Sequence, residues 1–315
     1  MKLAVIMDPI DEIIPQKDGT LDLLLEAQSR SYEITYFEQK DLKIMDGKAI
    51  GSGKKLQVED NPDKWFSFKE DHETELSYFD IILMRKDPPF NTEYIYATYI
   101  LDLAAADGSL VVNRPDALRN FNEKVSISLF PHVTPKTLIS CAEKELRGFI
   151  AKQDKTVVKP LDGMGGKSIF IIDKNDLNTR SILEAVTSDF TKTIMAQTYV
   201  PEITAGDKRI HIVNGKHCEV LLARIPSETD HRGNLVMGAK PEVQPLSDRD
   251  KEICNTIAPT LVENGILFAG IDVIGDFLTE INITSPTGMR EIDKYHQYSV
   301  SAILFNQLEK ILNEK

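Results

Sequence analysis

The first 120 residues alternate short apolar runs with segments of helical periodicity, and this alternation limits the possible folds more than any other feature of the chain. Strands that alternate with helices along a sequence usually form a parallel sheet with helices on both faces. We therefore expect an α/β fold that begins with a doubly wound layer. The expected strands are 3–7, 34–37, 79–85 and 109–113, and the expected helices are 20–29 and 92–106.

Charge, cysteine content and one missing motif exclude several classes of protein. The net charge of −12 repels polyanions, so we expect no nucleic-acid partner and no membrane, and an anionic substrate needs a local basic pocket. Three widely separated cysteines favour a reducing cytoplasm over a disulfide framework or a zinc knuckle. The apolar run before Asp8 is too short for a signal sequence. The loop "MDPIDEI" that follows lacks Gly-x-Gly-x-x-Gly, which argues against a dinucleotide-dependent oxidoreductase.

A chain of 315 residues is long enough for two or three subdomains. We expect an N-terminal α/β domain on the substrate side at 1–120, a central unit at 121–200 and a C-terminal unit at 201–315. Within the last unit, "PSETDHRGNLVMGAKP" at 226–241 carries two prolines, two glycines and mixed charge, which is typical of a lid or binding loop. A surface excursion without a function is the alternative for this loop.

The stretch "KPLDGMGGKSIF" at 159–170 looks like a phosphate-binding loop, but it lacks the Walker spacing. Gly163 and Gly166 enclose two residues, whereas the Walker pattern has four residues between its glycines. Strand-like residues lie on both sides, at 156–158 and 168–172, so we predict a glycine-rich hairpin. Free backbone amides in such a hairpin can cradle a phosphate. A flexible hairpin without a ligand is the alternative.

The segment "LTEINIT" is the strongest candidate for a metal site. Glu280, Asn282 and Thr284 alternate with isoleucines, so a strand here has one oxygen-rich face, and Asp272 lies on the preceding strand. Carboxylate and amide oxygens without His or Cys select Mg²⁺ over zinc or copper. A solvated strand face is the alternative interpretation.

The length of the turn between these strands decides whether the two carboxylates share a face. A two-residue turn at 275–276 would place Asp272 opposite Thr279, whereas a three-residue turn at 275–277 places it opposite Glu280. Two like charges side by side are costly unless a cation lies between them. We predict the three-residue turn and a shared face.

Several basic residues are candidates for binding anionic substrates. Lys124, in a stretch that we expect to be helical, and Lys159, before the glycines, are placed to reach phosphates. The others that we single out are Arg85, Arg209, Arg224 and Arg232. Ordinary surface residues are the alternative for any one of them. Six histidines without zinc spacing and the absence of Gly-x-Ser-x-Gly indicate chemistry by charge and positioning rather than by a covalent nucleophile.

Motifs spread over nearly the whole chain, in a constant order, resemble bacterial glutathione synthetases, which are ATP-grasp ligases. They are "MDP", "LMRKDPPF", "YIYATYIL", "NEK", "KPLDGMGG", "MAQ", "GDKR", "LARIP", "RGN", "IDVIGD" and "TEINITSPT". The resemblance implies an ATP-grasp fold behind an N-terminal doubly wound domain. ATP would lie between the central and C-terminal units.

The resemblance also assigns roles to residues. The implied ATP contacts are Lys124, Lys159, Gly163, Met164, Gly165, Gly166, Gln197, Tyr199, Val200 and Asp207. The implied metal ligands are Asp272, Glu280 and Asn282. The implied substrate contacts are Arg85, Asn234, Ser285 and Thr287, and the implied catalytic residues are Arg209, Arg224 and Arg232.

The implied reaction joins γ-glutamylcysteine to glycine through an acyl-phosphate, with ATP and Mg²⁺ or Mn²⁺, in a cytoplasmic homotetramer or dimer. Another ATP-grasp ligase, of the D-alanine or peptide-glutamate type, and a non-catalytic nucleotide-binding protein are the alternatives. The chain has Lys240 and Pro241 where the family has a Gly-Gly-Arg-Gly run, so we expect a weaker or differently hinged lid. Lys167 stands where a small residue is expected.

Overall fold

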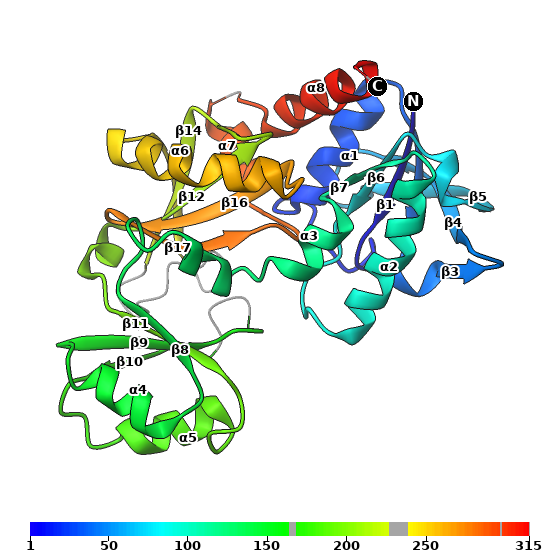
Figure 1. Ribbon diagram of the computed structural model, residues 1–315. Helices are drawn as coiled ribbons and strands as arrows, with labels where there is room; N and C mark the ends of the chain where they lie inside the picture. The colour runs from blue at the N-terminus through cyan, green and yellow to red at the C-terminus, as the bar shows by residue number, and fades with distance from the viewer. Residues whose placement is uncertain (164–167, 227–238, 297, 315) are drawn as a thin grey trace.

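The computed structural model describes residues 1–163, 168–226, 239–296 and 298–314. Its described strands form three sheets (Figure 1), and the first of them is the predicted doubly wound layer. The parallel strands of this sheet, in spatial order, are β2 (Glu33–Phe37), β1 (Lys2–Ile6), β6 (Ile81–Met84) and β7 (Leu110–Val112).

Helices α1 (Gly19–Ser29) and α2 (Thr92–Ala106) cover opposite faces of this sheet. Leu3 and Val5 share a buried cluster with the leucines of α1, whereas Ala4 and Ile6 share one with Tyr94 of α2. Successive residues of a strand point to opposite faces, so an uninterrupted apolar run is buried on both sides. The expected α/β doubly wound domain is therefore confirmed.

An antiparallel extension lengthens this sheet beyond β2. It consists of β3 (Leu42–Met45), β4 (Lys48–Val58) and β5 (Phe66–Glu75). The remaining short helices of the protein are α3 (Pro115–Asn120) and the 3₁₀ segments η1 (Gln39–Asp41), η2 (Leu76–Tyr78), η3 (Val125–Leu129) and η4 (Pro201–Ala205).

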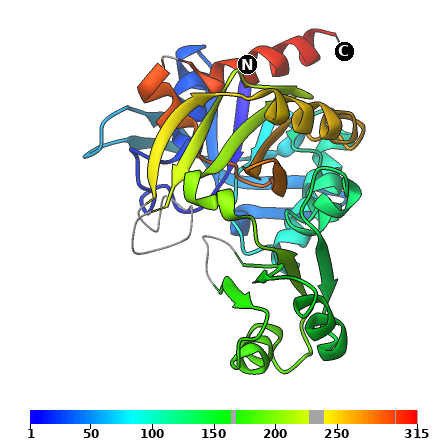
Figure 2. The same cartoon turned by 90° about the vertical axis from the view of Figure 1, so that its left-hand side faces the viewer.

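The central sheet projects from the rest of the molecule (Figures 1 and 2). Its strands, in spatial order, are β10 (Phe170–Asp173), β9 (Lys155–Pro160), β11 (Ile194–Thr198) and β8 (Thr137–Ser140). Helices α4 (Glu143–Ile150) and α5 (Thr179–Thr187) pack on it through one buried cluster. Because β10 runs antiparallel to β9 after the glycines, the prediction of a second strand rather than a Walker-type helix is confirmed.

The third sheet carries the acidic strand segment. Its strands, in spatial order, are β15 (Lys240–Pro245), β14 (Val220–Ile225), β12 (Asp207–Val213), β16 (Phe268–Ile274) and β17 (Phe277–Asn282), with β13 (Lys216–His217) paired to β12. Helix α6 (Asp248–Glu263) begins after a capping box formed by Ser247 and Asp250. Lys240 and Pro241 pair with β14 as the start of β15, so the connection between the two strands is 226–239, two residues shorter than the predicted loop.

The turn between β16 and β17 has two residues, not the predicted three. Ile274 pairs with Phe277, which leaves Gly275 and Asp276 in the turn. Gly275 takes a φ of +55°, in the left-handed region that tight hairpin turns require and that glycine adopts without strain.

A β-bulge nevertheless produces the predicted pairing. Val273 pairs with Leu278, but the register then shifts by one, so that Asp272 pairs with Glu280 and Thr279 is the extra residue. A bulge inserts one residue into one strand and re-aims the side chains beyond it. The predicted pairing of the two carboxylates is confirmed, and the predicted turn is wrong because a bulge, not the length of the loop, sets the register.

The last two helices return to the N-terminal domain. Helices α7 (Met289–His296) and α8 (Val300–Asn313) lie beside α1 (Figure 1). Arg30, at the C-terminal cap of α1, forms an ion pair of 3.0 Å with Glu309 of α8, and the Tyr32 hydroxyl donates to the same carboxylate at 2.9 Å. Among the described helices, none is long and apolar enough to cross a membrane.

The hairpin geometry predicts opposite effects for two glycine substitutions. Gly275→Ala puts a Cβ at positive φ, 3.0 Å from the Glu202 side chain, and should destabilise the protein by about 1–2 kcal/mol. Gly148→Ala, in α4 with open space around it, is the matched control and should stabilise it by about 0.5–1 kcal/mol. Urea unfolding of the two variants measures both values. Equal shifts of the same sign would contradict the assigned backbone conformations.

Candidate active site

Two carboxylates and an amide converge where β16 and β17 pair. Asp272 lies opposite Glu280, and the Asn282 amide donates to Asp272 Oδ2 at 3.3 Å. Asp272 is 5% exposed, and the other two side chains are half-buried. Within the described residues, no group of three or more His, Cys, Asp or Glu side chains is arranged to hold a metal ion. The set here has only two carboxylates, but with the amide it offers the hard oxygen donors that suit Mg²⁺.

Two arginines grip Asp272. Arg209, on β12, donates from Nε to Oδ1 at 2.6 Å and from Nη2 to Oδ2 at 3.2 Å, and Arg224 Nη2, from β14, lies 2.9 Å from Oδ1. Burial alone would raise the pKa of the Asp272 carboxyl, but the two guanidinium groups outweigh it and hold that pKa well below its usual range. Asp272 is therefore ionised at neutral pH, with both oxygens engaged by arginine.

Asp207 is the second carboxylate on Arg224. Its Oδ2 lies 2.7 Å from Arg224 Nη2, whereas its Oδ1 is buried and has no partner in the structure. Burial raises the pKa of Asp207 to about 7 against the attraction of Arg224, and the charges of Asp272 and Glu280 add to the rise. A buried carboxylate oxygen without a partner is costly, so this position favours a donor from a ligand or a water molecule.

Two lysines from other segments converge on Glu280. Lys159 Nζ, at the end of β9, lies 3.2 Å from Glu280 Oε1, and Lys124 Nζ lies 3.8 Å from the same oxygen. Lys124 also pairs with Glu123 and donates to the Gly163 carbonyl at 2.8 Å. Burial opposes ionisation of Glu280, but the two ammonium groups prevail and lower the pKa of its carboxyl.

The lysines reach this position from an unexpected local structure. Lys124 was predicted in a helix, but it is the residue before the 3₁₀ segment η3, and its side chain is 3% exposed. Lys159 is 5% exposed. Lysines are rarely buried unless they are paired, and here three chain segments far apart in sequence meet at one carboxylate.

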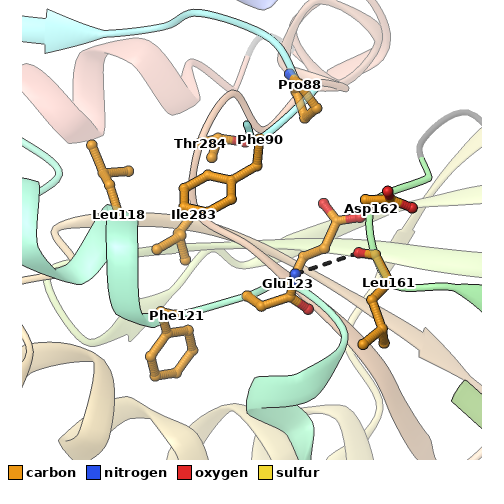
Figure 3. A pocket seen from close by; sticks show the side chains of 10 residues that line it. Pro88, Phe90, Leu118, Phe121, Glu123, Leu161, Asp162, Ile283 and Thr284 are labelled. Carbon is orange, nitrogen blue, oxygen red and sulfur yellow. Dashed lines mark hydrogen bonds between the residues drawn. The ribbon is translucent and has the colours of Figure 1, made fainter. Parts of the chain in front are cut away.

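A pocket adjoins this cluster (Figure 3), and it contains a carboxylate, Glu123, that the sequence analysis missed. Its position next to Lys124 in the "NEK" motif was the sequence feature that could have identified it as a site residue. The lining residues are Pro88, Phe90, Leu118, Phe121, Asn122, Glu123, Leu161, Asp162, Ile283 and Thr284. Apolar side chains form most of the wall, and Glu123 and Asp162 lie at the same side of it.

Three of the predicted ATP contacts, Gln197, Tyr199 and Val200, lie together at the end of β11. Gln197 is buried and donates to the Thr137 hydroxyl at 3.0 Å, Tyr199 is half-buried, and Val200 is buried. Met195, two residues before Gln197, pairs with Lys159 on β9. The three residues therefore belong to the same sheet as Lys159, and their role with a nucleotide stays a prediction.

Ser285 and Thr287, two of the predicted substrate residues, follow β17, and a third, Arg85, follows β6 and contacts the same segment. Arg85 is 4% exposed, and it donates to the Thr20 hydroxyl at 3.1 Å and to the Pro286 carbonyl at 2.9 Å. Arg209 donates to the next carbonyl, that of Thr287, at 3.2 Å, and the side chain of Thr287 is exposed. Ser285, half-buried, precedes this pair. Arg85 and Arg209 thus hold consecutive carbonyls of the segment after β17.

Several predicted residues lie outside the described part of the chain. These are Met164, Gly165, Gly166, Lys167, Arg232 and Asn234. The expected lid is described only at its two ends, at 226 and at 239–241. The roles predicted for these residues stay predictions.

The chain matches known proteins over its whole length. Residues 1–119 match the N-terminal domain of prokaryotic glutathione synthetase, and residues 123–297 match the ATP-grasp domain of that enzyme. The glutathione synthetase of Vibrio parahaemolyticus is 46% identical over 98% of this chain and 98% of its own length. Those of Photorhabdus laumondii and Escherichia coli are 46% and 45% identical over 100% of both chains.

Solved structures confirm the fold. The D-cycloserine synthetase DcsG has a TM-score of 0.67 at 13% identity, covering 99% of this chain and 100% of that protein. The ATP-grasp ligase PsnB, solved with a minimal precursor, has a TM-score of 0.63 at 13% identity, covering 98% of each chain. The predicted ATP-grasp fold is thereby confirmed.

His211, beside this site, predicts an acid-sensitive stability. Its Nε2 contacts the Thr287 carbonyl at 3.1 Å, and its Nδ1 is buried and has no hydrogen-bond partner among the described residues. Burial, with Arg209 nearby, lowers the pKa of His211 to about 3 from 6.5. Below pH 6.5 the unfolded chain therefore binds a proton that the folded chain does not, so the stability that is complete above pH 6.5 is lost as the pH falls towards 3.

The expected loss from His211 between pH 7 and pH 5 is about 2 kcal/mol. His211→Gln keeps a donor for the Thr287 carbonyl but does not titrate, so its unfolding free energy should fall by about 2 kcal/mol less than that of the wild type over this range. Urea unfolding at both pH values measures the difference. His132→Gln, at an exposed position, is the control and should behave as the wild type. An equal fall in His211→Gln would contradict the prediction.

Proposed function

The chain belongs to the prokaryotic glutathione synthetase family, and from that membership we propose that it ligates γ-glutamylcysteine to glycine with ATP. The products are glutathione, ADP and phosphate. The cysteinyl carboxylate takes the γ-phosphoryl group of ATP to give an acyl-phosphate, and the amine of glycine then displaces phosphate. Such a reaction needs charge neutralisation and positioning rather than a protein nucleophile.

The convergence of Lys124 and Lys159 on Glu280 is the structural observation that supports this proposal most directly. The two ammonium groups come from the N-terminal side of the central unit and from β9, and the carboxylate comes from the third sheet. An ATP-grasp ligase needs this junction, because the triphosphate lies between the two sheets and meets both lysines. Glu280 neutralises both lysines, and in this proposal the phosphates of ATP take its place.

The charge balance of the cluster supports a divalent cation. Four cations and four anions are already paired here: Lys124, Lys159, Arg209 and Arg224 with Glu123, Asp207, Asp272 and Glu280. The triphosphate of ATP therefore arrives with uncompensated negative charge, and metal ions are the usual source of the balancing charge at phosphate sites.

Asp272, Glu280 and Asn282 would hold this cation, and their oxygen donors suit Mg²⁺ or Mn²⁺. When bound, it supplies charge that neutralises the triphosphate and the developing phosphoryl group. Arg209 and Arg224 would orient Asp272 towards it, since both already grip that carboxylate.

The other site residues have roles that follow from the same proposal. Lys124 and Lys159 would bind phosphates, together with the backbone of 163–166. Asp207 would contact the nucleotide. The adenine pocket would be lined by Gln197, Tyr199 and Val200. Ser285 and Thr287 would bind the peptide or glycine carboxylates, with Arg85 behind them. Arg232 and Asn234 would act from the loop 226–239, because an acyl-phosphate must be protected from water.

The alternatives receive less support. The solved ATP-grasp ligases with other names are 12–14% identical to the chain, which shows a common fold and nothing of the substrate. A nucleotide-binding protein without turnover would not need to keep the paired lysines and carboxylates of the junction. A cytoplasmic homo-oligomer is the remaining part of the proposal, by analogy with the family.

Glycine-dependent turnover is the first test. With ATP, Mg²⁺ and γ-glutamylcysteine present, the wild type should release ADP only when glycine is added, apart from slow hydrolysis of the acyl-phosphate. A coupled assay of ADP release measures both rates. Turnover that is equal without glycine, or faster with D-alanine or glutamate in its place, would contradict the proposal and favour another ATP-grasp ligase.

The variant Glu280→Gln tests the proposed metal ligands. It keeps a side-chain oxygen for the two lysines but loses the negative charge. We expect kcat to fall at least about 100-fold and the Mg²⁺ requirement to rise, because the ligand for the cation is weakened. The exposed Asp276→Asn, in the turn of the same hairpin, is the control and should retain full activity. Mg²⁺ titrations after EDTA treatment and thermal unfolding provide the measurements. A folded Glu280→Gln variant with an unchanged rate would remove Glu280 from the metal site.

A further inference from the structure

The N-terminal sheet has a topological switch point between β1 and β6. From β1 the chain passes through α1 to β2 on one side, and from β6 it passes through α2 to β7 on the other. In open α/β sheets, ligands bind outside the carboxyl ends of the strands at such a point. Beyond these two ends lie Asp8, the second residue after β1, and Arg85, Lys86 and Asp87, the first three residues after β6.

Charges of both signs are packed together at this edge. Lys86 Nζ lies 2.7 Å from Asp8 Oδ1, and the Asp87 backbone amide donates to Asp8 Oδ2 at 2.9 Å. The Asp87 carboxylate accepts a hydrogen bond from the Ser285 hydroxyl. All these side chains are half-buried. An ionic cluster at a strand end is therefore joined directly to the segment that follows the proposed metal ligands.

Arg85 supplies an independent sign of a missing ligand. Its Nε and Nη2 donate hydrogen bonds, but Nη1 is buried and has no hydrogen-bond partner among the described residues. The residue as a whole is only 4% exposed. Asp87 is the strongest charged neighbour of this guanidinium. A buried guanidinium nitrogen without an acceptor is costly. Burial also raises the pKa of Asp87, and the charge of Asp8 adds to the rise.

We propose that this edge binds the amino-acid head group of the γ-glutamyl residue, with its α-ammonium between Asp8 and Asp87 and its α-carboxylate on Lys86 and Arg85. The inference rests on the proposed function and names the part of the peptide that the N-terminal domain recognises. An α-amino acid carries one charge of each sign on one carbon, and the cluster offers two carboxylates and two cations. We call these four residues the head-group site.

The reach of the substrate fits this placement. Ser285, which bonds Asp87, follows Asn282 by three residues, and three residues of extended chain span at most about 11 Å. The six bonds from the glutamyl α-carbon to the cysteinyl carboxyl carbon cover roughly 7–8 Å. The two lengths are of the same order, so we expect one extended dipeptide to place its head group in the head-group site and its reacting carboxylate near Asn282.

The pocket in Figure 3 lies along this path. Pro88 and Thr284, which line it, are the chain neighbours of Asp87 and Ser285, and Glu123, on another side, is the neighbour of Lys124. The middle of the dipeptide would pass the wall that these residues share with Phe90 and Ile283.

Two substrate analogues test the ammonium-binding and the carboxylate-binding parts of the head-group site separately. Glutarylcysteine lacks the α-amino group, and 4-aminobutyrylcysteine lacks the α-carboxylate. With saturating ATP, Mg²⁺ and glycine, wild-type kcat/KM should be at least about 100-fold higher for γ-glutamylcysteine than for either analogue, because each analogue leaves buried charges unpaired.

Single substitutions should remove these preferences one at a time. Asp87→Asn should lower kcat/KM for γ-glutamylcysteine at least about tenfold and leave the value for glutarylcysteine within about twofold of wild type. Lys86→Met should also lower kcat/KM for γ-glutamylcysteine at least about tenfold, and it should leave the value for 4-aminobutyrylcysteine within about twofold of wild type. Asp11→Asn, an exposed carboxylate in the loop after β1, is the matched control and should keep both preferences. Thermal unfolding shows whether each variant is folded.

The outcomes distinguish this inference from the proposed function. Equal losses with γ-glutamylcysteine and with the analogue, or a wild type that accepts the analogues equally well, would overturn the head-group site while the ligase activity stands. A wild type without glycine-dependent turnover would overturn the proposed function instead. Titration calorimetry with γ-glutamylcysteine alone would then decide. Binding at least about tenfold weaker in both folded variants supports the head-group site, and unchanged binding overturns it.

Discussion

The ion pairs of Asp272 with Arg209 and Arg224 fix the positions of the strands that form the site. Arg209 and Arg224 project from β12 and β14 onto a carboxylate of β16, so three adjacent strands are fixed to one buried charge. Removing a single partner from such a cluster would leave an uncompensated buried charge, which costs more than the pair contributes. Glu280, opposite Asp272, extends the cluster to Lys159 of the central sheet and couples the two sheets electrostatically.

Local sequence signals predicted the elements around this cluster well. Helix α2 has the bounds that its pattern indicated, because Asn91 caps its first turn and Gly108 follows its last. The candidate metal ligands were found by their alternation along β17. The bulge at Thr279 was not predictable, because a two-residue turn and a bulge together give the same pairing as a three-residue turn. The partners of Lys124 and Arg209 also depend on contacts between distant segments, which no local pattern encodes.

Arg85 illustrates the limit of assigning a role from a motif. The resemblance implied a direct contact with substrate, and the structure gives the side chain two further bonds, to Thr20 and to the Pro286 carbonyl. Arg209 donates to the next carbonyl, that of Thr287. Arginines from two different sheets therefore bond consecutive carbonyls of one short segment. This segment therefore links the N-terminal domain to the sheet that carries the site carboxylates.

The return of α8 to α1 has a consequence for synthesis on the ribosome. The apolar side of α1 is covered partly by Val300, Leu304 and Phe305, which are translated long after α1. That side of α1 therefore stays uncovered by α8 until the ribosome has translated the central sheet and the third sheet.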